Sequence, residues 1–523
     1  MRPVGPEQQI AIIDLGSNTA KLVAIGYRPG YAYRHVDQLR DVVRLSAGMR
    51  RDGRLQDDAI ERAMSTLHSF RRFCEASGIT EILATATSAV RDASNGPAFV
   101  ERVARETGIR LRVLSGEEEA KAGVLAIANS VADPDAMVVD LGGGSAQISE
   151  MRQRASVAGT SWPLGAVRTT ERFLGSDPPK KKHLKALRKA VQDAVVPWLD
   201  ARDVEAMTLG APGISEMAWI GMGGTLRSLA EAWQARIAYP LDWLHGYAFE
   251  AQDLSTLTEE LVAMNEAERR SVPGIGSDRA DIIVAGAVVL DEIMRLSGRS
   301  EVIVSGQGVR EGMFYPKLFA QSPDFLADDV RAFSARNLMR RHHDDTTHSE
   351  RVADLSLSMF DGLAAHLGYG SFERDLLRAA AWVHDVGMAI DFFGHHRHGS
   401  YLVLAANLHG YSHREHVLIA DMVRWHRKGR AAPEAAVGLL EEGDAERLRV
   451  LTGMLRVAEQ LERSKAGRVD TVEARLGDSL LELVVRTKGD AALELQHAAG
   501  STDLLASALQ REVRIVTERE VLA

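Results

Sequence analysis

Two short segments of this chain repeat the same order of residue types, and this repetition limits the possible folds more than any other feature. Residues 11–17 (AIIDLGS) and 137–145 (MVVDLGGGS) each place an apolar run before an aspartate, an apolar residue, glycine and a hydroxyl residue. Such a run ending in a glycine turn is typical of a buried strand followed by a loop whose backbone N–H groups can converge on an anion. We therefore predict a duplicated subdomain with one phosphate loop in each half.

The two loops supply the first candidate site residues. Those predicted to bind phosphate through backbone or side-chain groups are Asp14, Ser17, Asn18, Gly142, Gly143, Gly144 and Ser145. Asp14 and Asp140 end the two strands and would repel a phosphate directly, so we expect them to hold Mg²⁺ or another divalent cation against it. One such loop could equally be a tight turn with an Asx-type hydrogen bond. Two copies in the same strand context favour phosphate binding.

Length and composition indicate an ordinary globular protein with several domains. The chain has 523 residues, 45% of them hydrophobic and 26% charged, which predicts two to four domains. The formal net charge of −9 argues against nucleic acid as a partner, so a polyanionic substrate would need a local basic track. Cys74 is the only cysteine, which excludes an intrachain disulfide and a thiolate metal cluster.

The sequence offers no membrane or export signal. Pro3, Gly5, Pro6 and Glu7 stand where a secretory signal would need an apolar stretch. The apolar run at residues 282–290 is shorter than the roughly 20 residues that span a bilayer. We expect a cytoplasmic protein without a membrane partner.

The secondary-structure pattern changes along the chain. Up to about residue 315, β-branched runs alternate with amphipathic stretches, as in an α/β fold. Strands are expected at 10–13, 22–27, 81–86, 111–114, 137–139 and 301–304, and helices at 57–77, 97–107 and 118–129. Residues 326–464 read as nearly continuous helix, followed by a small α+β tail. The predicted domains are 1–131, 132–315, 325–465 and 466–523.

Five segments in order resemble the motif series of the exopolyphosphatase and guanosine pentaphosphate phosphohydrolase (Ppx/GppA) family. They are residues 14–19 (DLGSNT), 115–120 (SGEEEA), 140–145 (DLGGGS), 220–225 (IGMGGT) and 309–312 (VREG). The resemblance covers residues 8–315 and implies two actin-like ATPase (ribonuclease H-like) lobes with an active site in the cleft between them. It also implies a homodimer.

The resemblance implies which carboxylate is catalytic. It also identifies one position at which this chain departs from the family pattern. Of the three glutamates at 117–119, Glu119 aligns with the catalytic residue, and Glu118 is the alternative if the register slips. Asp140, Asp14 and Glu119 are the expected metal ligands. Where relatives usually carry glutamate, this chain has Gln147, whose amide has no charge and cannot act as a base.

Basic residues are expected to hold the phosphate chain. Arg91 matches the family arginine at the chain-binding cleft, although it could also be a solvated arginine at a strand end. Lys21 and Arg279 stand where guanosine-pentaphosphate-binding relatives resemble one another in carrying basic residues. Arg168 is a weaker candidate for phosphate contact.

The helical region is rich in histidine. His348, His384-Asp385 and Glu459 resemble the ordered signature of HD-domain metal phosphohydrolases, and His395, His396, His398 and His426 lie nearby in the sequence. The closing aspartate of that signature is glutamate here, and helical appendages of the Ppx/GppA family often keep the fold without metal chemistry. We therefore favour an HD-like, non-catalytic module, with a working metal site as the alternative.

These observations predict a metal-dependent exopolyphosphatase that removes terminal orthophosphate from inorganic polyphosphate. A guanosine pentaphosphate 5′-phosphohydrolase is the first alternative, because Lys21 and Arg279 fit a guanosine polyphosphate as well. A polyphosphate-dependent nucleotide phosphotransferase is a second. A non-catalytic sensor of polyphosphate or nucleotide is a third, made conceivable by Gln147.

Overall fold

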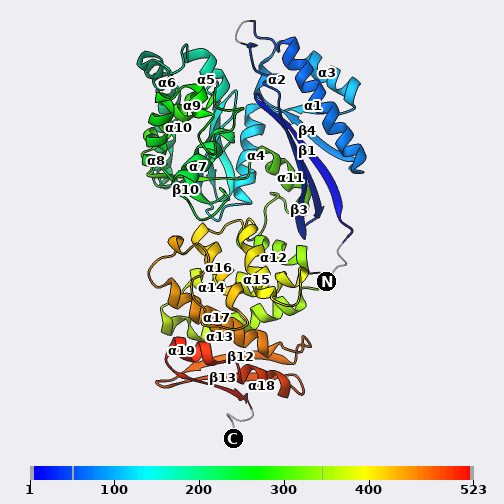
Figure 1. Ribbon diagram of the computed structural model, residues 1–523, viewed down its shortest axis with the longest axis vertical. Coiled ribbons are helices and arrows are strands. Elements are labelled where there is room, and N and C mark those ends of the chain that lie inside the picture. The colour runs from blue at the N-terminus through cyan, green and yellow to red at the C-terminus, as the bar shows by residue number, and fades with distance from the viewer. Residues whose placement is uncertain (1–4, 50–51, 344, 519–523) are drawn as a thin grey trace. The chain divides into compact units, whose positions relative to one another are not determined.

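The computed structural model describes residues 5–49, 52–343 and 345–518 of the chain, which forms two compact units, Met1–Ala327 and Asp328–Ala523 (Figure 1). Residues 1–4 of the amino-terminal segment discussed above lie outside this description. Within the described residues, no helix combines the length and the apolar character needed to cross a membrane.

The first sheet carries the first predicted phosphate loop. Its strand order is β3-β2-β1-β4-β5, in which β1, β2 and β3 form an antiparallel meander and β4 and β5 run parallel to β1. The strands are β1 (Gln8–Leu15), β2 (Thr19–Arg28), β3 (Ala32–Val42), β4 (Glu81–Ala86) and β5 (Leu111–Val113). The accompanying helices are α1 (Asp57–Ala76), α2 (Ser88–Asp92) and α3 (Gly96–Thr107). The next helix, α4 (Gly116–Ala128), packs on the second sheet.

The second sheet repeats this order. Its strands follow β10-β11-β9-β6-β7-β8, with an antiparallel β6-β7-β8 meander, parallel β9 and β11, and an added antiparallel edge strand, β10. The predicted duplication is therefore confirmed. The strands are β6 (Ala136–Leu141), β7 (Ala146–Arg152), β8 (Ala155–Trp162), β9 (Ala218–Met222), β10 (Tyr247–Glu250) and β11 (Glu301–Val304). The helices are α5 (Ala166–Phe173), α6 (Lys181–Leu209), α7 (Gly224–Arg236), α8 (Ala251–Ala263), α9 (Glu266–Arg269), α10 (Ile283–Ser297) and α11 (Val309–Leu318).

The duplication extends to the strand register beside each loop. Asp14 of β1 is paired with Lys21 of β2, and Asp140 of β6 is paired with Gln147 of β7. Directly opposed residues of an antiparallel pair project from the same face of the sheet. Lys21 and Gln147 are thus equivalent positions, each beside the aspartate of its own lobe.

The last helix of the second lobe packs on the first sheet. α11 contacts β1, and Phe314 of α11 meets the ring of Tyr27 of β2 edge to face. The Gly30 N–H also donates to the Leu318 carbonyl at 2.6 Å. α11 lies against α4 as well, and Gly312 approaches so closely that an added Cβ would stand 1.8 Å from the Ala122 carbonyl oxygen. The predicted boundary between residues 131 and 132 separates the strands of the two sheets, but α4 and α11 both cross it, since α4 packs on the second sheet and α11 on the first.

The sequence pattern located six strands of the two sheets and missed five. The expected strands at 81–86 and 301–304 coincide with β4 and β11, and those at 10–13 and 137–139 are the buried centres of β1 and β6. β3, β7, β8, β9 and β10 were not predicted. Of these, β3 and β8 lie at sheet edges and expose much of their length, so they lack the apolar run that marks a central strand. β7 and β9 are buried strands that the pattern missed.

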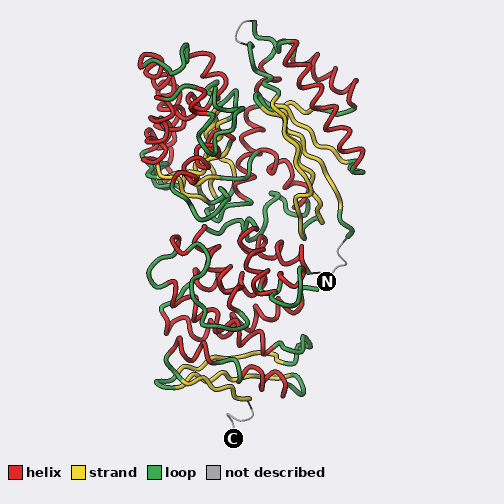
Figure 2. The backbone as a smooth tube through the Cα atoms, in the orientation of Figure 1, coloured by secondary structure: helices red, strands yellow, loops and turns green. Residues whose placement is uncertain are grey.

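The second unit joins helices to a small sheet around one hydrophobic core. Figure 2 shows the three strands as a layer beside the helices of this unit. Val472 and Leu483 of the strands belong to the same buried cluster as Leu451 and Met454 of a helix. The predicted tail at 466–523 therefore shares the core of the helical region. The elements are α12 (Val330–His342), α13 (Thr347–Leu367), α14 (Ser371–Val383), η2 (Val386–Ala389), α15 (His395–Ala405), α16 (His413–Trp425), η3 (Val437–Leu439), α17 (Asp444–Leu461), β12 (Val469–Leu476), β13 (Leu480–Thr487), α18 (Ala492–Ala499), α19 (Asp503–Leu509) and β14 (Glu512–Thr517).

Candidate functional site

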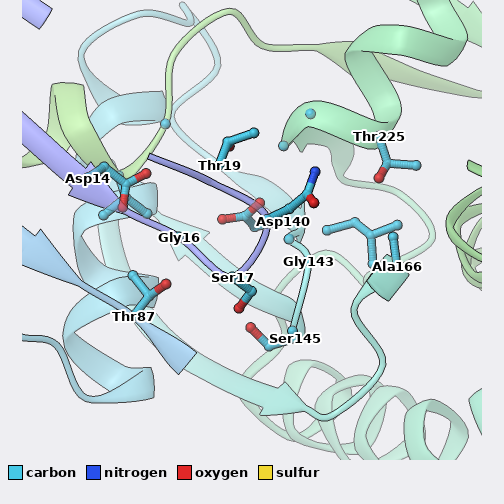
Figure 3. A pocket seen from close by; sticks show the side chains of 18 of the residues that line it. Asp14, Gly16, Ser17, Thr19, Thr87, Asp140, Gly143, Ser145, Ala166 and Thr225 are labelled. Carbon is cyan, nitrogen blue, oxygen red and sulfur yellow. The ribbon is translucent and has the colours of Figure 1, made fainter. Parts of the chain in front are cut away.

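The two predicted phosphate loops meet at one cavity of the first unit. Figure 3 shows Asp14 and Asp140, which end β1 and β6, together with Ser17 and Ser145 of the two loops, around the same pocket. Eleven of the predicted site residues line it. They are Asp14, Ser17, Asn18, Lys21, Glu119, Asp140, Gly142, Gly143, Gly144, Ser145 and Arg279.

The loops approach so closely that glycine is required at the contact. A Cβ on Gly144 would stand 2.4 Å from the Ser88 hydroxyl oxygen and 2.7 Å from that of Ser17. A Cβ on Gly165 would stand 2.4 Å from the backbone of Gly144. The Ser17 and Ser88 hydroxyl oxygens are themselves hydrogen-bonded at 3.0 Å. Without side chains at residues 142–144, the backbone of this loop can come within hydrogen-bonding distance of an anion in the cavity.

Three helices begin at residues that line the cavity. α5 begins at Ala166, α7 at Gly224 and α11 at Val309, and all three residues belong to the lining. The first N–H groups of a helix have no partner within the helix and form the positive end of its dipole. Several helix starts around one cavity favour an anionic ligand there.

Three carboxylates share the cavity, and their environment opposes ionisation. Burial and the charge of Asp140 raise the pKa of Glu119 to about 7, and the side chain is only 7% exposed. Burial raises the pKa of Asp140 to about 6. Burial also raises the pKa of Asp14, against the lowering influence of Arg310 and Lys21. Carboxylates this close to one another gain stability from a cation between them.

Cations line the same cavity. Burial and the neighbouring charges of Arg227, Arg310 and Arg279 lower the pKa of Lys21 to about 7. Burial lowers the pKa of Arg279 to about 10. A cluster of buried cations that depress one another's pKa values is stabilised by an anion with several negative charges.

Sequence reasoning missed two of these cations. Arg227 stands in the first turn of α7, two residues after the segment 220–225, and Arg310 lies inside the segment 309–312. Both positions are close to a glycine turn at a helix start, which could have drawn attention to them. Their approach to Asp14 and Asp140 depends on how the lobes pack, and this is not visible in local sequence.

The basic lining continues into an adjacent hollow. Lys21, Arg227 and Arg279 border both spaces, and Arg40 borders the second. Arg40 forms an ion pair with Asp278, which also borders the second hollow. A phosphate in the first cavity could thus be part of a longer anion that extends along these side chains.

Two arginines predicted to bind phosphate have protein partners instead. The Arg91 Nη1 group donates to Glu119 Oε2 at 3.1 Å and to the Leu114 carbonyl at 3.0 Å. Arg91 is not among the described residues that line the cavity, although it contacts one that does. Arg168 forms an ion pair with Asp92 at 2.8 Å and lies outside the cavity.

Glu118, the alternative catalytic position, caps a helix. Its Oε2 accepts a hydrogen bond from the Ser115 N–H at 2.9 Å, and the Ser115 hydroxyl accepts one from the Glu118 N–H at 3.1 Å. This is a capping box at the start of α4. Glu118 is half-exposed and does not line the cavity, whereas Glu119 is buried against it, so the geometry favours the register that selects Glu119.

Gln147 is buried beside Asp140 without satisfied polar atoms. The side chain is 3% exposed, and neither its Nε2 nor its Oε1 has a hydrogen-bond partner within the described structure. Buried amide groups are normally paired. The Gln147 amide therefore has hydrogen-bonding groups that are not used, next to Asp140, the proposed metal ligand.

The residues present suit a divalent cation with oxygen ligands. Asp14, Asp140 and Glu119 bring carboxylate oxygens to one cavity, and Asp14 Oδ1 is buried without a hydrogen-bond partner in the described structure. Mg²⁺ is usually held by one or two protein carboxylates together with substrate phosphates and water. The donor set thus fits Mg²⁺, with phosphate completing its surroundings.

Comparisons with known proteins show which family and which solved structures the chain is similar to. The model of the Ppx/GppA phosphatase family matches residues 29–320, which is more than half of the chain, and that of Ppx/GppA phosphatase domain III matches residues 330–512. An exopolyphosphatase from Cytophaga hutchinsonii is 26% identical, with 60% of this chain and 98% of that one covered and a TM-score of 0.54. A family member from Aquifex aeolicus is 25% identical, with 61% and 99% covered and a TM-score of 0.51.

Proposed function

The chain belongs to the Ppx/GppA phosphatase family, and on that premise we propose that it is an exopolyphosphatase, which hydrolyses terminal orthophosphate from inorganic polyphosphate. One observation carries this proposal: carboxylates from both lobes and a group of buried cations line the same cavity as the two glycine loops. This combination suits a highly charged phosphoanhydride. The structural similarity to an exopolyphosphatase supports the choice of substrate.

Glu119 is the proposed catalytic base. Its carboxylate is buried and its pKa is raised to about 7 by burial and by Asp140, so near neutral pH it can both exist ionised and accept a proton from water. Arg91 fixes its orientation through the hydrogen bond to Oε2. A base with this pKa works best near neutral pH.

The loops and cations are proposed to position the phosphate chain. The backbone of residues 142–145 and the hydroxyls of Ser17 and Ser145 would donate to the terminal phosphate, and Arg227 and Arg310 would balance its charge. Asp14, Asp140 and Glu119 would hold Mg²⁺. When bound, the ion supplies charge neutralisation and polarisation of the phosphoryl group.

The adjacent basic hollow supports a long substrate. Arg40, Lys21 and Arg279 extend the positive lining beyond the space that a single phosphate would occupy. The same residues favour guanosine pentaphosphate as the second candidate, because its phosphates could follow this path.

Phosphate release measured at equal enzyme concentration from long-chain polyphosphate and from guanosine pentaphosphate tests the order of these candidates. We expect a higher kcat/KM on polyphosphate. Turnover of the nucleotide far above that of polyphosphate would reverse the order. Adding ADP with polyphosphate and measuring ATP distinguishes the phosphotransferase, and negligible release from every substrate would favour a sensor.

Further parts of the proposal are a homodimer and a cytoplasmic location. The dimer would join the basic tracks of two chains and is tested by light scattering of the purified protein. If the protein is a monomer and hydrolyses long polyphosphate as efficiently as short polyphosphate, the proposed role of a dimer in binding long chains is wrong.

A further inference from the structure

The helical unit contains a second cluster of side chains that can bind metal, and the family function does not use it. Two groups of ligand atoms each lie within 4.8 Å of one another. The first group is His348, His384 and Glu459, and the second is Asp385, His395 and His426. They come from α13, α15, α17 and the segments that follow α14 and α16.

Asp385 lies between the two groups and turns one carboxylate oxygen to each. Its Oδ2 is 3.8 Å from His348 Nε2 and 3.6 Å from His384 Nε2. Its Oδ1 is 3.4 Å from His395 Nε2 and 4.0 Å from His426 Nε2. The residue is only 5% exposed. A carboxylate in this position can bridge two ions.

The backbone fixes three of the imidazoles with the same nitrogen facing the cluster. Each Nδ1 lies within hydrogen-bonding distance of the carbonyl oxygen three residues earlier, at 2.7 Å for His384, 2.9 Å for His395 and 2.7 Å for His426. A carbonyl oxygen only accepts, so Nδ1 carries the hydrogen. In the neutral ring Nε2 then presents a lone pair, as metal-binding histidines do.

Several buried polar atoms of the cluster have no hydrogen-bond partner among the described residues. These are both ring nitrogens of His348, Nε2 of His384 and Oε2 of Glu459. The Nε2 atoms of His395 and His426 are 3.2 Å apart, so two lone pairs would face each other in the neutral rings. Leaving such groups buried without partners is costly. Metal ions would satisfy one ring nitrogen of His348 and each of the other atoms.

We propose that this cluster is a second metal centre, which holds two divalent ions bridged by Asp385. His348, His384 and Glu459 bind one ion, and His395 and His426 bind the other. Bonds to imidazole and carboxylate are about 2.0–2.2 Å long, so atoms on opposite sides of one ion are about 4.2 Å apart, close to the observed spread. Mixed nitrogen and oxygen ligands select first-row transition metals such as manganese, iron, cobalt or zinc over Mg²⁺ and Ca²⁺.

The second ion keeps positions open for an exogenous ligand. Asp385, His395 and His426 supply three protein ligands, which is the pattern of catalytic rather than structural metal sites. The Lys465 ammonium stands 3.5 Å from Asp385 Oδ2 and is half-exposed, so it can meet an anion that reaches the ions from solvent. Paired ions of this kind act on phosphate esters. The ligand class assigned to the open positions is therefore a phosphate group.

This proposal differs from the non-catalytic module that the sequence favoured. The glutamate at position 459 was one of the two reasons for that prediction, yet a carboxylate oxygen of Glu459 lies in the first group of ligand atoms. His395 and His426, which fall outside the signature quoted from the sequence, complete a second group. The full set of ligands appears only when the helices pack.

Metal content of the full-length protein tests the proposal. All variants carry Asp140→Asn to weaken the cleft site, are stripped with a chelator and are dialysed against Co²⁺ before bound cobalt is counted. We expect His348→Gln and His395→Gln each to lose one ion per chain, and Asp385→Asn to lose two. His366→Gln, an exposed position on α13, is the matched control and should lose none. Equal cobalt content in all five proteins would overturn the proposal.

A second measurement tests the open positions. Inorganic phosphate should change the visible absorption of bound Co²⁺ in the parent and in His366→Gln, and should have no effect in Asp385→Asn. A parent spectrum that does not respond to phosphate would overturn the assignment of an anion ligand. Circular dichroism of the metal-free proteins establishes that each variant folds. If a buried-histidine variant does not fold, Glu459→Gln provides the same test, because loss of one ion is again expected and an unchanged count contradicts it.

Discussion

The Arg91 guanidinium donates a hydrogen bond from Nη1 to Oε2 of Glu119, and the two atoms lie 3.1 Å apart. This contact opposes the three influences that raise the pKa of Glu119, which are burial and the charges of Asp140 and Asp14. Arg91 therefore determines how much of the proposed base is ionised at neutral pH. Its importance for catalysis follows from this contact even without direct contact to phosphate.

Replacing Arg91 should move the acid limb of the pH profile upward. In Arg91→Met, Glu119 loses its cationic partner, so its pKa rises further and a higher pH is needed to ionise it. The kcat/KM for polyphosphate, measured from pH 5.5 to 9, should show a limb displaced to higher pH by about one unit. Arg91→Lys keeps the charge and should show a smaller displacement. A limb that stays in place while activity falls would assign Arg91 to phosphate binding alone.

Glu119→Gln should abolish most hydrolysis and leave substrate binding in place. The amide keeps the shape of the side chain but cannot accept a proton from water, so we expect a loss of roughly 10²- to 10⁴-fold in kcat. The affinity for polyphosphate, measured by calorimetry, should stay close to that of the parent protein. Glu118→Gln is the matched control, because the half-exposed neighbour caps α4 and glutamine can also complete a capping box. Equal losses in both variants would remove Glu119 from its proposed role.

Lys21 should make substrate binding weaken above neutral pH. Burial and three neighbouring arginines lower its pKa to about 7, so the ammonium is charged below that pH and loses its charge as the pH rises through it. We expect the KM for polyphosphate to increase above pH 7. Arg replaces Lys without losing charge in this range, so Lys21→Arg should show a flatter KM profile. The same increase in both proteins would show that another group titrates.

Gly144→Ala should separate the two loops. The new methyl group would collide with the hydroxyls of Ser88 and Ser17, at 2.4 and 2.7 Å. We expect kcat/KM to fall at least about tenfold, with a destabilisation of about 1–3 kcal/mol from overpacking. Gly142→Ala tests the same loop without this collision, because the nearest atom to its Cβ would be the Ser145 carbonyl oxygen at 3.5 Å. Similar losses in both would indicate that backbone flexibility, rather than close approach, requires glycine.

The sequence was most informative where the signal is local. The loops after Asp14 and Asp140 and the helix start at Glu119 depend on neighbouring residues, and all three line the cavity. Arg168 was expected at phosphate, but an ion pair with Asp92 holds it outside. Sequence spacing does not reveal which carboxylate an arginine will meet.

In the helical unit, too, sequence spacing does not reveal which side chains meet. The histidines at 384 and 426 are 42 positions apart in the sequence, yet their rings lie 5.3 Å apart between centroids. The two rings come together because α14 and α16 pack against each other. No sequence motif within either helix predicts that packing. Sequence resemblance suggested one set of ligands, and the packing adds the second.

The pairing of Asp140 with Gln147 gives a prediction about the cation. Gln147→Glu would place a second carboxylate opposite Asp140 on the same face of the sheet, at a position whose amide atoms are buried without hydrogen-bond partners in the described structure. The added negative charge should strengthen Mg²⁺ binding roughly tenfold at pH 8, where both groups are ionised.

The gain should shrink as the pH falls. The pKa of Asp140 is already raised to about 6 by burial, and a neighbouring carboxylate raises it further, so protonation removes the added charge on the acid side of neutrality. Mg²⁺ titration calorimetry at pH 8 and pH 6 measures both effects. Gln147→Met, which fills the space without charge, is the control and should bind Mg²⁺ no better than the parent at either pH. If Gln147→Glu also leaves the dissociation constant unchanged at pH 8, residue 147 lies outside the reach of the cation, and its departure from the family pattern does not affect the metal.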